Sequence, residues 1–107
     1  MSARIDQRSI MARRRQDGAA VVVTGAAGGI GGGIVERLLA DGWRVIATDL
    51  SASQLERLQD GAPGDALSLA ALDVSDSKAV DALAANLKAR GTPVAGLVNA
   101  AGLLQDI

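Results

Sequence analysis

The chain lacks cysteine and histidine, and Trp43 is its one aromatic residue in 107 positions. Without cysteine there is no disulfide framework and no thiolate metal site. Without histidine the commonest general base and the commonest metal ligand are missing. The absence of cysteine fits a reducing compartment, and we expect a cytoplasmic protein. A hydrophobic core must be built almost entirely from aliphatic side chains.

Strong charge and long apolar runs are also scarce. The formal net charge is −1, which provides no strong field to hold nucleic acid or an anionic membrane. No apolar run approaches the ~20 residues that span a bilayer, and the N-terminus lacks the apolar core of a secretory signal. We therefore expect neither a nucleic-acid partner nor a membrane partner.

The first 18 residues contain five arginines and form a separate segment. We expect residues 1–18 to be a disordered extension and residues 19–107 to be the folded domain. A mitochondrial presequence is the alternative for the extension, and Asp6 and Asp17 argue against it. Met11 is an alternative start of the protein.

From residue 19 onward, short apolar runs recur at a regular spacing. Runs of four to eight apolar, partly β-branched residues are typical of strands that are buried on both faces. The expected strands cover residues 19–24, 44–48, 67–72 and 94–98.

Amphipathic stretches separate these strands. Ile30, Ile34 and Leu38 recur every four residues and predict a first helix that ends at Gly42. Charged residues of the same stretch fall on the opposite side of this helix. The order of elements is βαβαβαβ, which predicts a parallel sheet with right-handed helical crossovers.

Two further helices follow. Ser51 and Gln54 form a capping box at the start of the second, which Gly61 ends. Ser75 is expected to cap the third, which ends at Gly91. The apolar stripe expected on the third helix consists of Val80, Leu83, Ala84 and Leu87.

A glycine-rich stretch, residues 24–31, lies between the first strand and the first helix. The N-terminus of a helix offers unpaired N–H groups and a positive dipole end, which favour a pyrophosphate. Glycines at Gly25, Gly29 and Gly31 permit a tight turn and a close approach of backbone to ligand. A P-loop is excluded because no Lys-Ser/Thr pair follows these glycines.

The spacing resembles the short-chain dehydrogenase/reductase family, whose core members carry T-G-x-x-x-G-x-G. Thr24, Gly25, Gly29 and Gly31 match this motif. The same stretch also matches T-G-x-x-G-x-x-G of the extended members, through Gly28 and Gly31. The loop alone therefore leaves the subfamily open.

Acidic residues follow the second and third strands. Asp49 lies 20 residues after Gly29, where a carboxylate can accept hydrogen bonds from the adenosine ribose of NAD. The resemblance implies that Asp73 and Val74, which follow the third strand, contact the adenine.

The segment Asn99-Ala100-Ala101-Gly102 follows the fourth strand and resembles the N-N-A-G segment of the core members. Extended members usually carry a histidine-containing segment there, so the chain is similar to the core type. Ala100 replaces the second Asn, a change shared by some core members, including dehydrogenases of dihydroxylated cyclohexadiene acids. Asn99 should border the crevice where the strand order reverses.

The resemblance implies a partial Rossmann fold, a doubly wound parallel sheet with strand order 3-2-1-4 that stops before the catalytic half. With Asp49 at the ribose position, and Gly28 and Leu50 where NADP-preferring members usually carry a basic residue, we expect NAD as the cofactor. The cofactor-binding residues expected on this basis are Thr24, Gly25, Gly29, Ile30, Gly31, Asp49, Leu50, Asp73, Val74, Asn99, Ala100 and Gly102.

No catalytic residue of the family can be assigned here. The family uses a Tyr, a Lys four residues later and a Ser, all beyond a fifth strand. This chain has no Tyr, and Lys78 and Lys88 precede Asn99. We expect a truncated segment of an oxidoreductase that transfers a hydride between NAD(H) and a small alcohol or ketone, and that forms a homo-oligomer.

Two alternatives stay open at this point. One is a non-catalytic dinucleotide-binding module or an inactive, truncated gene product. The other is a methyltransferase that binds an adenosyl cofactor, since such enzymes share a glycine-rich first loop and an acidic second strand end. Thr24-Gly25 and the segment 99–102 weigh against the methyltransferase.

Overall fold

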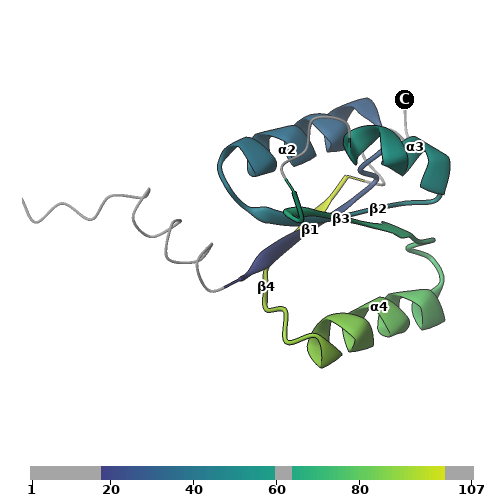
Figure 1. The fold of residues 1–107 in the computed structure, drawn as a ribbon. Coiled ribbons are helices and arrows are strands. Elements are labelled where there is room, and N and C mark those ends of the chain that lie inside the picture. The colour runs from purple at the N-terminus through teal and green to yellow at the C-terminus, as the bar shows by residue number, and fades with distance from the viewer. Residues whose placement is uncertain (1–17, 60–63, 101–107) are drawn as a thin grey trace, which may run out of the picture.

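A four-stranded parallel sheet is the centre of the molecule. The computed structural model describes residues 18–59 and 64–100 (Figure 1). The strands are β1 Ala20–Thr24, β2 Arg44–Asp49, β3 Leu67–Ala71 and β4 Val94–Asn99. Their order across the sheet is β3-β2-β1-β4, which confirms the predicted order.

Helices cover both faces of this sheet, as in a Rossmann-like α/β fold. Helix α2 (Gly29–Ala40) and helix α3 (Ala52–Glu56) lie on one face, and α4 (Ser77–Ala89) lies on the other (Figure 1). A short 3₁₀ helix, η1 (Arg57–Gln59), continues α3. None of the helices that the structure describes has the length and apolar character needed to cross a membrane.

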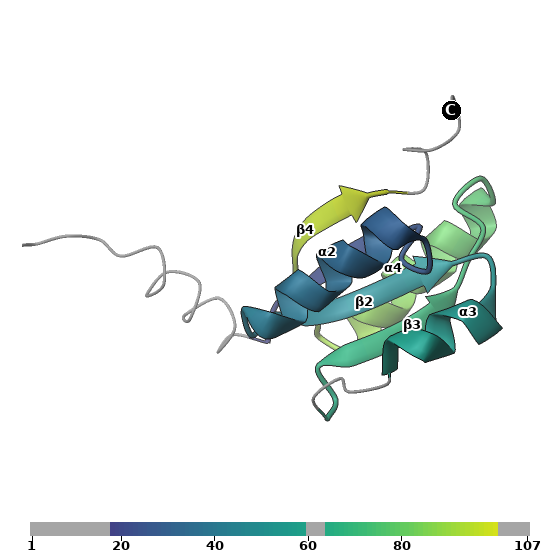
Figure 2. The ribbon, with the colours of Figure 1, turned by 90° about the horizontal axis from the view of Figure 1, so that it is seen from above.

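The register of the strands aligns their carboxyl ends. Thr24 pairs with Asn99 across β1 and β4, and Asp49 pairs with Ala71 across β2 and β3. Because all strands are parallel, the residues that follow them meet at one edge of the sheet. Seen from above, β3 and β4 lie on the two sides of β2 (Figure 2). Strand β1 lies between β2 and β4.

The core is aliphatic, as the composition predicts. On the face covered by α2 and α3, fully buried side chains include Val23, Val35 and Leu55, and Trp43 packs into the same cluster. On the other face a smaller cluster joins the sheet to α4. This cluster consists of Ala20, Val22, Ile46 and Leu87.

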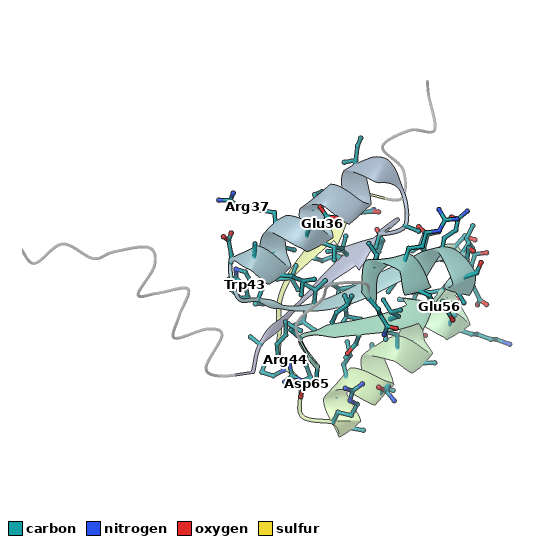
Figure 3. All side chains as sticks on the ribbon, turned by 45° about the horizontal axis from the view of Figure 1, so that its top comes forward. Glu36, Arg37, Trp43, Arg44, Glu56 and Asp65 are labelled. Carbon is teal, nitrogen blue, oxygen red and sulfur yellow. The ribbon has the colours of Figure 1, made fainter. Side chains whose placement is uncertain are left out.

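Helix α2 is amphipathic and ends as predicted. Asp41 is its C-cap, and Gly42 follows with φ of 88°, a left-handed conformation that suits glycine. Glu36 and Arg37 lie on its outer side, away from the sheet (Figure 3), and Arg37 Nε donates to Asp41 Oδ2 at 3.3 Å. The sheet side of the helix buries Val35.

The predicted boundaries need small corrections. Strand β1 begins at Ala20 rather than Ala19, β3 ends at Ala71 rather than Leu72, and β4 extends to Asn99. The second helix loses its α-helical form after Glu56 and ends as 3₁₀ turns. Its predicted cap is confirmed, because Gln54 N–H donates to Ser51 Oγ at 3.3 Å. The predicted N-terminal extension up to residue 17, the predicted helix end at Gly61 and residues 101–107 lie outside the described residues.

The prediction that Ser75 caps α4 is wrong. Asp76 is the N-cap, and its Oδ1 accepts from the N–H groups of Lys78 at 3.1 Å and Ala79 at 3.3 Å. Ser75 donates instead to Asp73, through its N–H at 2.9 Å and its hydroxyl at 2.6 Å. Once Asp73 holds Ser75 in a turn, the next polar residue takes the cap position.

This correction predicts a difference between two neighbouring variants. Asp76→Ala should lower the free energy of unfolding by about 1 kcal/mol, the usual loss for an N-cap carboxylate. Ser75→Ala keeps the α4 cap and should cost clearly less, since its bonds lie in an exposed turn. Chemical denaturation of both variants measures the difference. A larger loss of unfolding free energy for Ser75→Ala than for Asp76→Ala would contradict the assignment of Asp76 as the N-cap.

The edge at β4 is open within the part of the chain that the structure describes. No described strand pairs with its outer side, and Val94 and Leu97 are 50% and 66% exposed. They border an apolar groove of about 290 Å³ beside α4. Unpaired strand edges next to apolar surface favour association with another chain.

Candidate functional site

The loop between β1 and α2 turns sharply at Gly25. Gly25 has φ of 64°, a conformation that favours glycine. Its carbonyl accepts from Gly28 N–H at 3.2 Å, and the Gly28 carbonyl accepts from Gly32 N–H at 2.7 Å, which starts α2. The strand therefore passes into the helix through one tight turn.

Gly31 brings the first turn of α2 against this loop. A Cβ atom at Gly31 would lie 2.1 Å from the Gly25 carbonyl oxygen and 2.8 Å from the Gly25 carbonyl carbon. By contrast, a Cβ at Gly29 would meet no atom within 4 Å. Gly31 is thus required by the packing of the loop on its helix, whereas Gly29 borders open space.

The N–H groups of the loop fall into two sets. Ala26 N–H donates to the Thr48 carbonyl at 3.0 Å, and Ala27 N–H donates to Asp49 Oδ2 at 3.0 Å. No described residue accepts a hydrogen bond from the N–H groups of residues 29–31. These groups form the first turn of a 12-residue helix, whose positive dipole end favours an anion.

A pocket of about 290 Å³ lies next to this loop, beyond the ends of β2 and β3. It is lined by Gly25, Asp49, Leu50, Leu72, Asp73, Val74 and Ser75. Leu50 is 71% exposed and Val74 46% exposed, although both are large and apolar. Exposed apolar side chains around a pocket with a few polar groups are typical of a site for an organic ligand.

Asp49 stands between the loop and the pocket. Its Oδ1 accepts from its neighbour's N–H, that of Leu50, at 2.7 Å, and its Oδ2 accepts from Ala27 N–H at 3.0 Å. An ionised carboxylate has about four lone-pair sites, so about two remain for a ligand. The half-buried Asp49 can therefore hold the loop and accept hydrogen bonds from hydroxyl groups in the pocket.

Asp73 supplies the second carboxylate of the pocket. The Ser75 hydroxyl, and then the Ser75 backbone N–H, hold the pKa of the Asp73 carboxyl below its ordinary value by bonding its charged form. Asp73 is exposed and stays ionised at neutral pH. Two carboxylates on one pocket disfavour an added phosphate there and favour hydroxyl and amino donors.

A short network joins β1 to the end of β4. Thr24 Oγ1 donates to Asn99 Oδ1 at 2.7 Å, and Ala100 N–H donates to the Thr24 carbonyl at 3.2 Å. The side-chain oxygen of Asn99, Oδ1, is thereby oriented toward β1. This leaves the side-chain NH₂ group of Asn99 as the donor for other partners. The network fixes the carboxyl end of β4 beside the glycine loop.

The structure brings most of the predicted site residues to one edge. Gly25, Asp49, Leu50, Asp73 and Val74 line the pocket. Residues 29–31 form the adjoining helix end, and Thr24, Asn99 and Ala100 form the neighbouring network. Gly102 lies outside the described residues.

Three residues of this edge were not predicted as site residues. Leu72 and Ser75 line the pocket, and Thr48 contributes the carbonyl that accepts from Ala26. Thr48 is fully buried, and its hydroxyl donates to the Val23 carbonyl at 3.3 Å. A hydroxyl residue inside an apolar strand was the sequence signal for Thr48. Among the described residues, no group of three or more acidic side chains is placed to hold a metal ion.

Comparisons with known proteins agree with this architecture. The family model for short chain dehydrogenase matches residues 19–107. An NADP-dependent 3-hydroxy acid dehydrogenase from Escherichia coli is 41% identical over 78 residues, which are 73% of this chain and 31% of that protein.

Solved structures share the fold of this chain. A short chain dehydrogenase from Bacillus anthracis superposes with a TM-score of 0.71 at 20% identity, over 78% of this chain and 34% of that one. A 3-ketoacyl-(acyl-carrier-protein) reductase from Brucella melitensis, in complex with NADH, superposes with a TM-score of 0.62 at 32% identity, over 72% and 32% of the two chains.

The chain thus spans about a third of the length of the relatives that it matches. The match to the family model includes every described element, from β1 to β4. The chain belongs to the short chain dehydrogenase family.

Proposed function

We propose that this chain is the cofactor-binding portion of an oxidoreductase and that it binds NAD at the carboxyl edge of the sheet. The observation that carries the proposal is the arrangement around Asp49. Its carboxylate borders a pocket beside a helix N-terminus whose first N–H groups donate to no described residue. A dinucleotide needs this combination of an anion site and a hydroxyl-binding carboxylate.

The pyrophosphate and the adenosine part of the dinucleotide each have a matching group among the described residues. The pyrophosphate would accept hydrogen bonds from the N–H groups of residues 29–31. The adenosine ribose would donate to Asp49, and the adenine would lie between Leu50 and Val74, next to Asp73. Ile30, which is 47% exposed at the start of α2, would cover the cofactor from the helix side.

The preference for NAD over NADP is also a proposal. The related dehydrogenase from Escherichia coli is NADP-dependent, so family membership alone does not decide the cofactor. In this chain the pocket carries the carboxylates of Asp49 and Asp73. None of the described residues that line the pocket is basic. The two positions where NADP-preferring members of the family usually carry a basic residue, just before Gly29 and just after β2, are Gly28 and Leu50.

The complete enzyme would transfer a hydride between the nicotinamide and a small alcohol or ketone. The cofactor supplies the redox step, and the protein supplies position and a proton. Because these 107 residues contain no tyrosine, they do not supply the proton donor of the family. A role of this chain in binding alone, without turnover, is the second candidate, and the absence of tyrosine favours it.

The test is a titration of the chain with NAD, followed by NMR. We expect saturable shifts of the backbone amides of residues 29–31, Leu50 and Val74. Amides that line the apolar groove beside α4, such as that of Leu97, serve as the control and should not shift. Shifts confined to the groove, or no saturable shift, would refute the proposed site.

A further inference from the structure

We propose that Asp49 is also a positioning residue for the glycine loop, through the bond between its Oδ2 and Ala27 N–H. This bond would hold the loop in the shape that presents the N–H groups of residues 29–31 to an anion. The inference rests on the proposed function in one respect, namely that this anion is the pyrophosphate of a dinucleotide.

The contact joins two segments that lie 22 residues apart in the sequence. Thr48 and Asp49, at the end of β2, receive the consecutive N–H groups of Ala26 and Ala27. The first acceptor is a backbone carbonyl, and the second is a side chain. Of the side chains that the structure describes, Asp49 alone accepts a hydrogen bond from the backbone of residues 25–31.

The composition of the loop makes such a contact effective. Four of the seven residues from Gly25 to Gly31 are glycines, which restrict their own backbone least. A hydrogen bond to an ionised acceptor is about twice as strong as one between neutral groups. One carboxylate bond can therefore contribute much of the order of a loop that has few side chains to pack.

The charge of Asp49 and its contact with the loop act in opposite directions on an anion. The negative charge near the helix N-terminus repels pyrophosphate, whereas the contact arranges the N–H groups that bind it. Two neutral substitutions separate these effects. Asp49→Asn removes the charge and keeps one oxygen that can accept from Ala27 N–H, while Asp49→Ala removes both.

The first measurement is hydrogen exchange at Ala27 in the chain without ligand. Asp49→Ala should speed this exchange about tenfold or more, as expected for a bond to a charged group. The exchange rate of Ala27 in Asp49→Asn should lie between the rates in Asp49→Ala and in the unmodified chain. Unchanged exchange at Val22 and Val23 in β1 reports that the variants are folded. Equal exchange of Ala27 in all three chains would overturn the proposal.

Asp73→Ala is the matched control. It also removes a carboxylate from the pocket, but the bonds of Asp73 go to Ser75 and not to the loop. Exchange at Ala27 should therefore stay unchanged in this variant. A faster exchange equal to that of Asp49→Ala would mean that any charge in the pocket affects the loop, which would also overturn the proposal.

The second measurement uses inorganic pyrophosphate, which has no ribose for Asp49 to contact. Asp49→Ala should bind it about fivefold more weakly than Asp49→Asn, because both are neutral and only Asn retains the acceptor. Equal affinities would show that Asp49 does not position the anion site. If pyrophosphate bound to none of the chains, the proposed function would fail, and exchange at Ala27 would still decide whether Asp49 holds the loop.

Discussion

Replacing Gly31 with alanine is expected to lower the free energy of unfolding by about 3 kcal/mol, the upper end for an overpacked site. The added Cβ would lie 2.1 Å from the Gly25 carbonyl oxygen. The atoms that the Cβ would meet belong to the backbone of Gly25 and Ala26, so no flexible side chain can move aside. The loop would have to shift away from the first turn of α2, whose N–H groups we propose as the anion site.

Gly33→Ala is the matched control in the same helix. A Cβ at Gly33 meets no atom within 4 Å, and this position lies inside the helix. The substitution should stabilise the chain by about 0.5–1 kcal/mol, because alanine favours the helix more than glycine does. Denaturant unfolding of both variants tests the contrast. Similar stabilities for Gly31→Ala and Gly33→Ala would contradict the contact between the loop and α2.

Asp49→Ala is expected to weaken NAD binding at least roughly tenfold and to narrow the difference between NAD and NADP. Hydrogen bonds to a charged group contribute about 1.5–3 kcal/mol each, and 1.4 kcal/mol corresponds to a factor of ten. NADP places a phosphate where NAD has a ribose hydroxyl. Asp49 would then lose its hydrogen-bond donor and face a like charge at close range.

No cation near the pocket compensates for this repulsion among the described residues. Gly28 and Leu50 carry no charge, and Arg44 begins β2 at the opposite end of the sheet (Figure 3). Removal of the Asp49 carboxylate should therefore relieve NADP more than NAD. The dissociation constant for NADP divided by that for NAD should therefore fall, even though the loop contact is lost for both cofactors.

Asp41→Ala controls for the loss of one negative charge. Asp41 lies at the C-terminal end of α2, where its carboxylate contacts Arg37, away from the pocket. Calorimetric titration of this variant should give the same two dissociation constants as the unmodified chain. A similar fall of the ratio in Asp41→Ala would mean that overall charge, and not Asp49, sets the preference.

The fold could be predicted from the sequence because its signals are local. Apolar runs mark the strands, and left-handed glycines such as Gly42 and Gly91 mark the helix ends. The order of the strands came from the resemblance to the family, which the motif around Gly25 and Gly31 supported. Asp49 was placed at the correct edge because the end of a parallel strand fixes its position in the sheet.

The details that escaped prediction depend on competition or on distant contacts. Ser75 and Asp76 are both good helix caps, and the outcome depends on Asp73, which binds Ser75 first. The bond between Asp49 and Ala27 requires the exact alignment of β2 with the loop after β1, which no local pattern reveals. Exposure of Leu50 and Val74 likewise follows only from the assembled edge.

The most direct test of the proposed site is a pair of calorimetric titrations of the unmodified chain, one with NAD and one with NADP. We expect saturable binding of NAD at one site and weaker binding of NADP. This order follows from the two carboxylates on the pocket and from the absence of a basic side chain among the described residues that line it. Binding of NADP as tight as that of NAD, or tighter, would contradict the assignment of Asp49 to the adenosine ribose.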